Sequence, residues 1–459
     1  MVDTGSSVAG KPWRNAARVF DKVRNDLFVP APGGFPALDG IRAIAVLSVI
    51  LFHCAVFSNY VSSNMKAREV SLSLAQQILI NLWSGVDIFF VLSGFLIGRI
   101  LLRSLSSEGR LFYTSFLVRR SLRIFPLYYL VLTASLFWIA PNASGLFSGL
   151  WNTVFLRREM FLAFEPRAQV QGAIAIFEGQ WVAANQELLL TTAWTHYAYL
   201  SNYLLGSDAP KVMSWAWSLC VEEHFYLLLP PLLWLTVRKR RPVWHAVGLG
   251  LGLAIPFALR LAHYLGDSGV PVVAIYAKSH IRMDELFVGL VVAYFYVHHG
   301  AALARMAQRL GALLPLAGAL AIGSVWIFGD PELPGVFPVL FQFPLLAWGT
   351  ACFVVHGVSC QGIAVRLLSL RALYPVARVS YGMYLVHPLV MLSLLAGPFR
   401  PMLSQPEKGW LLLALYAATA VLSWLVAALL FVIFERPLLD LGARLSDRLT
   451  QNARDAHPR

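Results

Sequence analysis

Charged side chains are scarce in this sequence: they make up 13% of its 459 residues, whereas 58% are hydrophobic. Soluble domains carry roughly 25% charged and about 45–50% apolar residues. The deficit of charge therefore excludes an ordinary soluble domain. It predicts an all-α, polytopic integral membrane protein.

Cysteines and the common cofactor motifs are equally sparse. Four cysteines are too few and too scattered for a disulfide framework. No Gly-rich phosphate loop, HExxH motif or CxxC zinc pattern occurs. We therefore expect no metal and no bound cofactor. Residues 1–34 are polar and basic without an apolar core, so we also expect no cleavable signal peptide.

Long apolar runs recur along the whole chain. A span needs about 20 mostly apolar residues to cross a hydrocarbon core of about 30 Å. Ten runs are candidate spans: residues 41–58, 85–102, 124–140, 216–237, 243–263, 281–299, 312–329, 338–358, 379–397 and 410–434. A weaker eleventh, 188–205, contains Thr, His, Tyr and Asn, which is typical of an interfacial or re-entrant segment.

The distribution of the basic residues explains the net charge of +13. Cytoplasmic loops of membrane proteins collect Lys and Arg. With both termini in the cytoplasm, the basic groups RRSLR (119–123) and RKRR (238–241) and the basic C-terminal tail all lie on that side. We therefore expect this orientation, a multi-pass location in the inner (plasma) membrane, the lipid bilayer as a partner, and no nucleic acid.

The predicted organisation is a single transmembrane domain with two cytoplasmic ends. Residues 1–34 form a basic N-terminal segment, residues 35–440 the transmembrane domain and residues 441–459 the C-terminal tail. Residues 141–213 form one external segment within the domain. Loops of this length are usually functional or disordered.

Arg42 and His53 stand near the two ends of the first apolar run. Ionisable groups within spans are expensive and usually mark function. Positions 11 apart in a helix are about 16 Å apart along the axis and nearly on one face. Arg42 is therefore expected near the cytoplasmic end of that face and His53 near the external end. A snorkelling arginine and a hydrogen-bonded packing histidine are the alternatives.

Carboxylates are expected at the depth of His53. Asp87, at the start of the second span, is either a helix-start charge or an orienting partner of an imidazole. Ser218, Glu222 and Tyr226 recur every four residues and form one polar stripe on the fourth span. The pattern suits a general base, His53, oriented by Glu222 or Asp87 and acting on a hydroxyl. Simple charge pairing is the alternative for Glu222.

Further polar residues lie in or beside other spans. Arg282 is expected at the external start of the sixth span, and His387 about two turns from the cytoplasmic start of the ninth. Pro388 makes a helix kink the alternative reason for that motif. Arg120 and Arg123 share one cytoplasmic helical turn, where they either fix topology or bind an anion such as phosphate.

Seven motifs in the same order resemble the membrane-bound acyltransferase family 3, a family of integral membrane O-acyltransferases. They are LDGIRAIAVLSVILFHC, GVDIFFVLSGFLI, RRSLRIFPLY, WSLCVEEHFYLLLP, RMDELFVGL, SYGMYLVHP and FERP. The resemblance covers about residues 35–440. His224 departs from it, because many members have Gln there. The chain resembles a stand-alone member without a hydrolase-like extracytoplasmic domain.

The resemblance implies transfer of an acyl group, often acetyl, from cytoplasmic acyl-CoA to a hydroxyl of a carbohydrate or glycolipid acceptor. It implicates Arg42 and His53 in catalysis or acyl passage, and Arg120 and Arg123 in contacts with the CoA phosphates. Together with the pattern of polar residues, it gives two candidate sets. The catalytic set is His53, Glu222, Asp87 and Arg42; the binding set is Arg120, Arg123, Ser218, Tyr226, Arg282 and His387.

Three other functions are compatible with buried polar residues. A transporter or flippase would line a pathway with them, although we find no paired inverted repeat. An acyltransferase could act on a small secondary metabolite in place of a glycan. A membrane sensor or scaffold would tolerate alanine at these positions.

Overall fold

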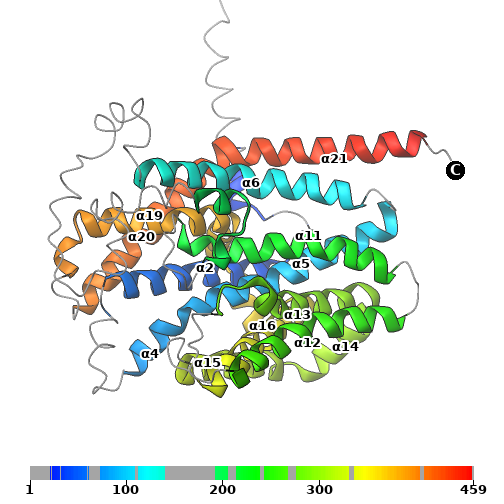
Figure 1. Cartoon of the computed structure of the whole chain (residues 1–459), viewed down its shortest axis with the longest axis horizontal. Coiled ribbons are helices and arrows are strands. Elements are labelled where there is room, and N and C mark those ends of the chain that lie inside the picture. The colour runs from blue at the N-terminus through cyan, green and yellow to red at the C-terminus, as the bar shows by residue number, and fades with distance from the viewer. Residues whose placement is uncertain are drawn as a thin grey trace, which may run out of the picture.

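The computed structural model describes residues 21, 23–30, 33–58, 60, 73–108, 112–139, 192–204, 213–237, 242–266, 275–329, 335–403 and 408–456. These residues form helices and the turns between them, and none of them lies in a strand. The all-α prediction is thereby confirmed for this part of the chain. Several of the long helices run in roughly the same direction (Figure 1).

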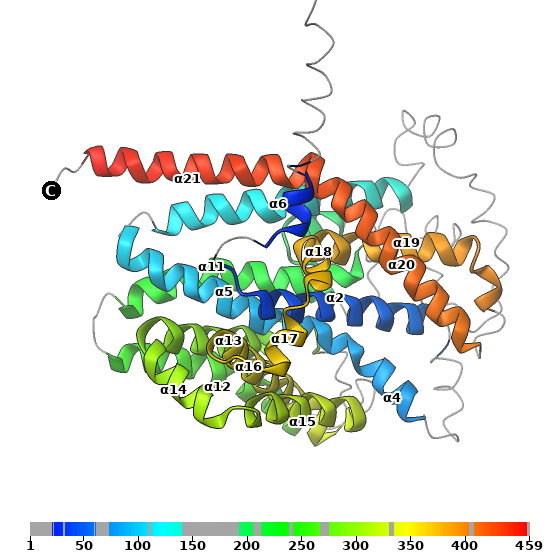
Figure 2. The ribbon, with the colours of Figure 1, turned by 180° about the vertical axis from the view of Figure 1, so that it is seen from behind.

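The main α-helices make up most of the described ranges. In chain order they are α2 (Pro36–Phe57), α4 (Leu74–Asn81), α5 (Gly85–Glu108), α6 (Phe112–Ile139), α11 (Trp217–Val237), α12 (Pro242–Gly266), α13 (Ser279–His298), α14 (Gly300–Leu310), α15 (Leu313–Phe328), α16 (Gln342–Ser359), α17 (Ile363–Leu368), α18 (Tyr374–Arg378), α19 (Ser380–Ala396), α20 (Gly409–Leu430) and α21 (Arg436–Ala456). The rear view shows α17 and α18 beside α2 (Figure 2).

Five helical segments in the described ranges are long and apolar enough to cross a membrane, or seven if two bent pairs each form one span. The bent pairs are α13 with α14, at 111°, and the α17–α18 segment with α19, at 62°. The second bend lies at Val379, not at Pro388, where the sequence suggested a kink. The protein is therefore a membrane protein, while the full set of ten spans and the sidedness of the termini remain predictions.

The remaining predicted spans also lie on helices. Residues 124–140, 216–237 and 312–329 overlap α6, α11 and α15, which do not meet the same length and composition criterion. The weak candidate 188–205 contains a short helix at 192–197 and a 3-10 turn, Ser201–Tyr203, so its described part is no spanning helix. Most of the predicted external segment 141–213 lies outside the described residues.

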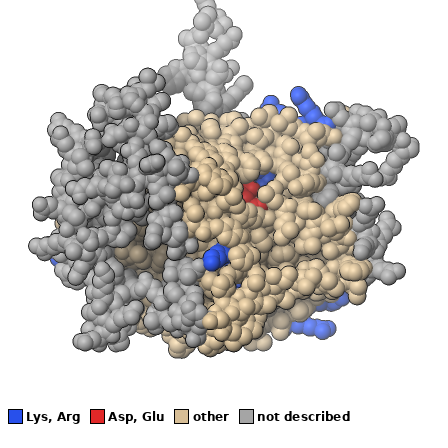
Figure 3. Space-filling model, in the orientation of Figure 1, with Lys and Arg blue, Asp and Glu red and all other residues tan. Residues whose placement is uncertain are grey.

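The outer surface suits a lipid environment. On the coloured, described part of the face in Figure 3, charged side chains are few and form small patches. Exposed Leu227, Leu228 and Trp234 of α11 and Leu251 and Ile255 of α12 belong to the apolar surface of the molecule. Because such an area would be costly in water, it is explained by contact with lipid.

Two glycines allow α5 and α13 to pack unusually closely. A Cβ atom on Gly94 would lie 2.0 Å from the Leu286 carbonyl oxygen, and one on Gly289 would lie 2.1 Å from the Val91 carbonyl oxygen. Only glycine permits this approach at either position. The close packing fixes one side of α5 against α13 and leaves another side to face the interior.

We predict that Gly94→Ala lowers the free energy of unfolding by about 1–3 kcal/mol, because the added methyl group meets a backbone atom. Gly250→Ala is the matched control, since nothing lies within 4 Å of a Cβ atom there and the change favours a helix. Thermal unfolding in detergent measures both. Equal midpoints for the two variants would contradict the role assigned to the close packing.

Candidate active site

A cavity of about 320 Å³ lies among α2, α5, α6, α11, α18 and α19. Four arginines line it: Arg42 from α2, Arg120 and Arg123 from α6, and Arg378 from α18. Its volume is within the range of about 300–1,000 Å³ that is common for small-molecule sites. Glu222 is the single acidic residue among its lining residues in the described part of the chain. The cavity is therefore suited to an anionic ligand.

A compact polar network borders this cavity through Ser93, Arg120 and Glu222, while Tyr226 is not among the lining residues. Tyr226 Oη donates to Glu222 Oε2 at 2.5 Å, and Arg120 Nη2 lies 3.4 Å from the same oxygen. Arg120 also donates to Tyr226 Oη and lies 4.0 Å above its ring, while Ser93 Oγ is 2.5 Å from that hydroxyl. The network joins α5, α6 and α11, so it fixes the direction of the Arg120 guanidinium.

The predicted stripe on α11 is confirmed in its geometry. Glu222 and Tyr226 are four residues apart and hydrogen-bonded, as neighbours on one helix face are expected to be. Ser218, one turn earlier, also lines the cavity. Its Oγ atom donates to Tyr384 Oη at 2.8 Å, because that hydroxyl itself donates to the Trp215 carbonyl oxygen at 2.5 Å.

His53 and His387 form a second polar pair. Nδ1 of His53 lies 2.8 Å from Nε2 of His387, and the two rings are stacked at 5.0 Å. His387 is fully buried, whereas His53 is partly exposed. Neither histidine is among the lining residues of the arginine cavity. The pair is thus a separate element of the site.

The partners of His387 determine the protonation of both neutral rings. Its Nδ1 atom lies 2.9 Å from the Tyr384 carbonyl oxygen and 3.1 Å from that of Met383. A carbonyl oxygen only accepts, so Nδ1 carries the proton and Nε2 accepts from His53 Nδ1. Nε2 of His53 is then left with its lone pair, as a general base requires.

The prediction that Glu222 or Asp87 orients His53 is wrong, because the ring of His53 donates its hydrogen bond to His387 of α19. Glu222 is held by Arg120 and Tyr226. The Asp87 Oδ1 atom accepts from Arg282 Nη2 at 2.5 Å. The position of Asp87 near the start of a span is compatible with a partner of His53. Its ion pair with Arg282 instead determines what Asp87 contacts.

Asp87 and Arg282 belong to a buried ion cluster outside the cavity. Arg282 also lies 3.1 Å from Glu285 and donates to the Tyr276 carbonyl oxygen at 2.7 Å. All three charged side chains have no exposed surface. The rings of Phe343 and Tyr276 lie 4.1 and 4.6 Å from the guanidinium carbon. The geometry supports a structural role, in which Asp87 holds α5 to α13, over the predicted catalytic and substrate-binding roles.

The site also contains residues that the sequence did not single out. Arg378 and Tyr384 line the cavity, and Ser93 completes its polar network. Ser93 lies in a motif quoted above, but no spacing linked it to Tyr226. Tyr384 lies in the same motif as His387, SYGMYLVHP, so its place in that motif was the available signal.

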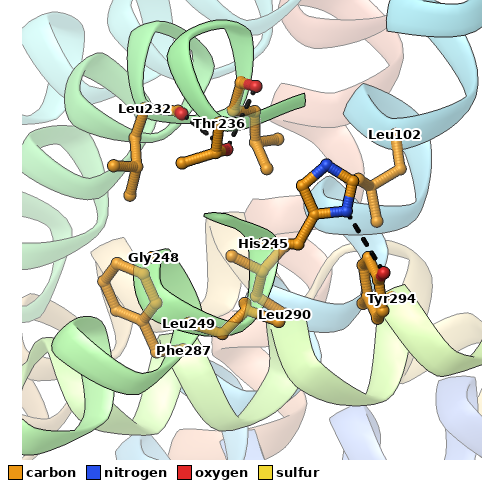
Figure 4. A pocket seen from close by; sticks show the side chains of 10 residues that line it. Leu102, Leu232, Thr236, His245, Gly248, Leu249, Phe287, Leu290 and Tyr294 are labelled. Atoms are coloured by element: carbon orange, nitrogen blue, oxygen red, sulfur yellow. Dashed lines mark hydrogen bonds between the residues drawn. The ribbon is translucent and has the colours of Figure 1, made fainter. Parts of the chain in front are cut away.

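A second, much smaller pocket lies among α5, α11, α12 and α13 (Figure 4). It has a volume of about 20 Å³ and is lined mainly by leucines, with His245 Nδ1 3.2 Å from Tyr294 Oη. A volume of roughly 10–15 Å³ of this kind holds one water molecule. The pocket is therefore too small for a substrate.

Comparison with known proteins places this site in a known family. The model of acyltransferase family 3, described as "Acyltransferase domain", matches residues 35–432. YrhL of Bacillus subtilis (strain 168), provisionally named a peptidoglycan O-acetyltransferase, is 28% identical over 78% of this chain and 49% of its own length.

Two other relatives carry similar names. The peptidoglycan O-acetyltransferase OatA of Listeria monocytogenes is 25% identical over 89% of this chain and 56% of its own length. The O-acetyltransferase OatA of Staphylococcus aureus (strain NCTC 8325) is 22% identical over 90% and 58%, respectively. The chain thus spans about half the length of the curated relatives it matches. No solved structure was found to match it.

We predict that Arg282→Met lowers the free energy of unfolding by about 3–5 kcal/mol, because it leaves buried carboxylates without their cation. Adding Asp87→Asn should recover part of this loss. Arg24→Ala is the control. The ion pair of Arg24 with Asp21 is 58% and 59% exposed, and such a pair contributes about 0–1 kcal/mol to stability. Chemical unfolding in detergent measures all three. A loss no larger than that of the control would contradict the structural role.

Proposed function

The chain belongs to acyltransferase family 3, and from this premise we propose that it is an O-acetyltransferase that acts on a hydroxyl of a cell-envelope glycan. The names of its relatives favour acetyl as the acyl group and a peptidoglycan-like polysaccharide as the acceptor. We further propose acetyl-CoA as the donor and the inner membrane as the location. The observation that carries the proposal is the pairing of a cationic cavity with a separate histidine dyad.

The arginine cavity is the proposed donor site. Arg123 and Arg378 form no ion pair within the described residues, whereas Arg120 pairs with Glu222 and Arg42 with Asp39. Guanidinium groups that form no ion pair are suited to the phosphates of CoA because they offer several donors in a planar fork. Phosphates bound there would direct the thioester along the cavity.

The cavity extends towards the dyad along α5. Val86, Phe90, Ser93, Ile97 and Ile100 all line it. Fourteen residues of helix separate the first from the last, which corresponds to about 21 Å. A Cβ atom on the adjacent Gly85 would lie 2.8 Å from the Val49 side chain, one helical turn before His53. The cavity therefore ends close to the depth of the dyad.

The proposed reaction needs one base. The acceptor hydroxyl oxygen attacks the thioester carbonyl carbon while its proton passes to Nε2 of His53. The C–S bond then breaks and leaves the acetyl ester on the acceptor. The proton moves from His53 to the departing thiolate, which gives the free thiol and restores the neutral imidazole. His387 does not touch the substrate in this scheme. It positions His53 by accepting a hydrogen bond from His53 Nδ1.

We predict that His53→Ala reduces acetyl transfer by about 10²–10⁴-fold, the usual contribution of general acid–base catalysis. The wild-type rate should fall as pH is lowered through the titration of imidazole, because a protonated ring cannot accept the hydroxyl proton. Labelled acetyl-CoA, membranes and a polysaccharide acceptor provide the assay. Covalent label on the acceptor also excludes transport alone.

His387 allows a sharper test of the dyad. His387→Phe keeps a planar ring but removes the acceptor, so kcat should fall with little change in KM for the donor. His387→Gln can still donate to a backbone carbonyl and accept from His53, so it should retain more activity than the Phe variant. Equal activity of the two variants would show that His387 merely fills space.

We predict that Arg123→Ala raises KM for acetyl-CoA by about 10-fold or more, since a hydrogen bond to a charged group contributes about 1.5–3 kcal/mol. Arg123→Lys should recover part of the affinity. Arg309→Ala is the control, because Arg309 is exposed on α14 and does not line the cavity. An unchanged KM in Arg123→Ala would argue against the cavity as the donor site.

A further inference from the structure

Tyr384 lies between the two parts of the site. Its side chain lines the arginine cavity, and its ring is 5.9 Å from the ring of His387. Its carbonyl oxygen accepts the His387 Nδ1 proton. Tyr384 therefore touches the cavity with its side chain and the dyad with its backbone.

The Tyr384 side chain is held firmly in this position. It is 7% exposed, and its hydroxyl is bonded both to Ser218 Oγ and to the Trp215 carbonyl oxygen. Swinging the ring away would break both bonds and leave the Trp215 carbonyl oxygen without this partner, which costs free energy in a buried setting. The ring is thus a fixed wall and not a freely moving side chain.

The wall stands at the outer end of the cavity. Ser218 follows Trp217, whose ring packs edge-on against Phe90 at 5.9 Å, and Phe90 lines the cavity near the start of α5. The arginine network is further along, at Ser93. A donor whose phosphates lie at the arginines would thus present its acyl group to Tyr384, on the side facing His387.

We propose that Tyr384 restricts the acyl group to short chains by closing the outer end of the donor cavity next to the dyad. This inference rests on the proposed function, because it requires an acyl thioester in the cavity. An acetyl group is the acyl chain that extends least beyond the thioester carbonyl towards this ring. Each additional methylene group must be accommodated against a buried ring that two hydrogen bonds hold in place.

The test compares kcat/KM for acetyl-CoA and hexanoyl-CoA. In Tyr384→Ala the ratio should move towards hexanoyl by at least about 10-fold, since one methylene group in an apolar pocket changes specificity by about 10–200-fold. Tyr384→Phe keeps the ring and loses only the hydroxyl, so its preference should stay much closer to that of the wild type. Tyr384→Leu provides an intermediate wall if the Ala variant does not fold.

Ile100→Ala is the matched control for loss of bulk. It enlarges the same cavity at the opposite end of α5 and should leave the chain-length ratio unchanged. An unaltered ratio in both folded Ala and Leu variants of Tyr384 would overturn the inference, as would an equal shift in Ile100→Ala.

Two outcomes separate this inference from the proposed function. If the wild-type protein transfers no acetyl from acetyl-CoA, the proposed function fails and the inference falls with it. If the wild type transfers acetyl, His53→Ala does not, and the Tyr384 variants keep the wild-type ratio, only the chain-length inference fails.

Discussion

The close contact of α5 with α13 is the constraint on which the rest of the site depends. Gly94 and Gly289 bring the two backbones together, and the Asp87–Arg282 ion pair joins the same helices at a fully buried position. Burying charges is costly, so such a pair requires good geometry and further hydrogen bonds. Glu285 and the Tyr276 carbonyl oxygen supply them. With α5 fixed in this way, its other side forms one wall of the cavity along most of its length.

The interior arginines fall into two groups, one paired within the fold and one facing the cavity, and their partners distinguish the groups. Arg282 is enclosed by carboxylates and aromatic rings, so its charge is already compensated within the fold. Arg123, by contrast, is exposed at a cavity and has no ion-pair partner in the described ranges. A charge held in a close ion pair stabilises a helix contact, whereas a cation at a cavity without such a pair is available to a ligand.

Local patterns in the sequence predicted local geometry well. The four-residue spacing of Glu222 and Tyr226 indicated one helix face, and their hydrogen bond confirms it. Partners distant in sequence could not be predicted, because they depend on how the helices pack. His53 and His387 are 334 positions apart, and no periodicity connects them. Asp87 shows the same limit: its place at the start of an apolar run fits either a catalytic carboxylate or a buried ion pair.

In the proposed reaction, the separation of the arginines from the histidines follows from what each part does. An anionic donor is held best where several guanidinium groups converge, while a general base must remain neutral until it takes the acceptor's proton. A phosphate bound beside an imidazole would also favour its protonated form, which cannot act as a base. Placing Arg42 and His53 about 16 Å apart on α2 keeps these requirements from conflicting. In the same proposal Tyr384 lies at the boundary between the two parts, and the acyl group is the part of the donor that has to reach the base.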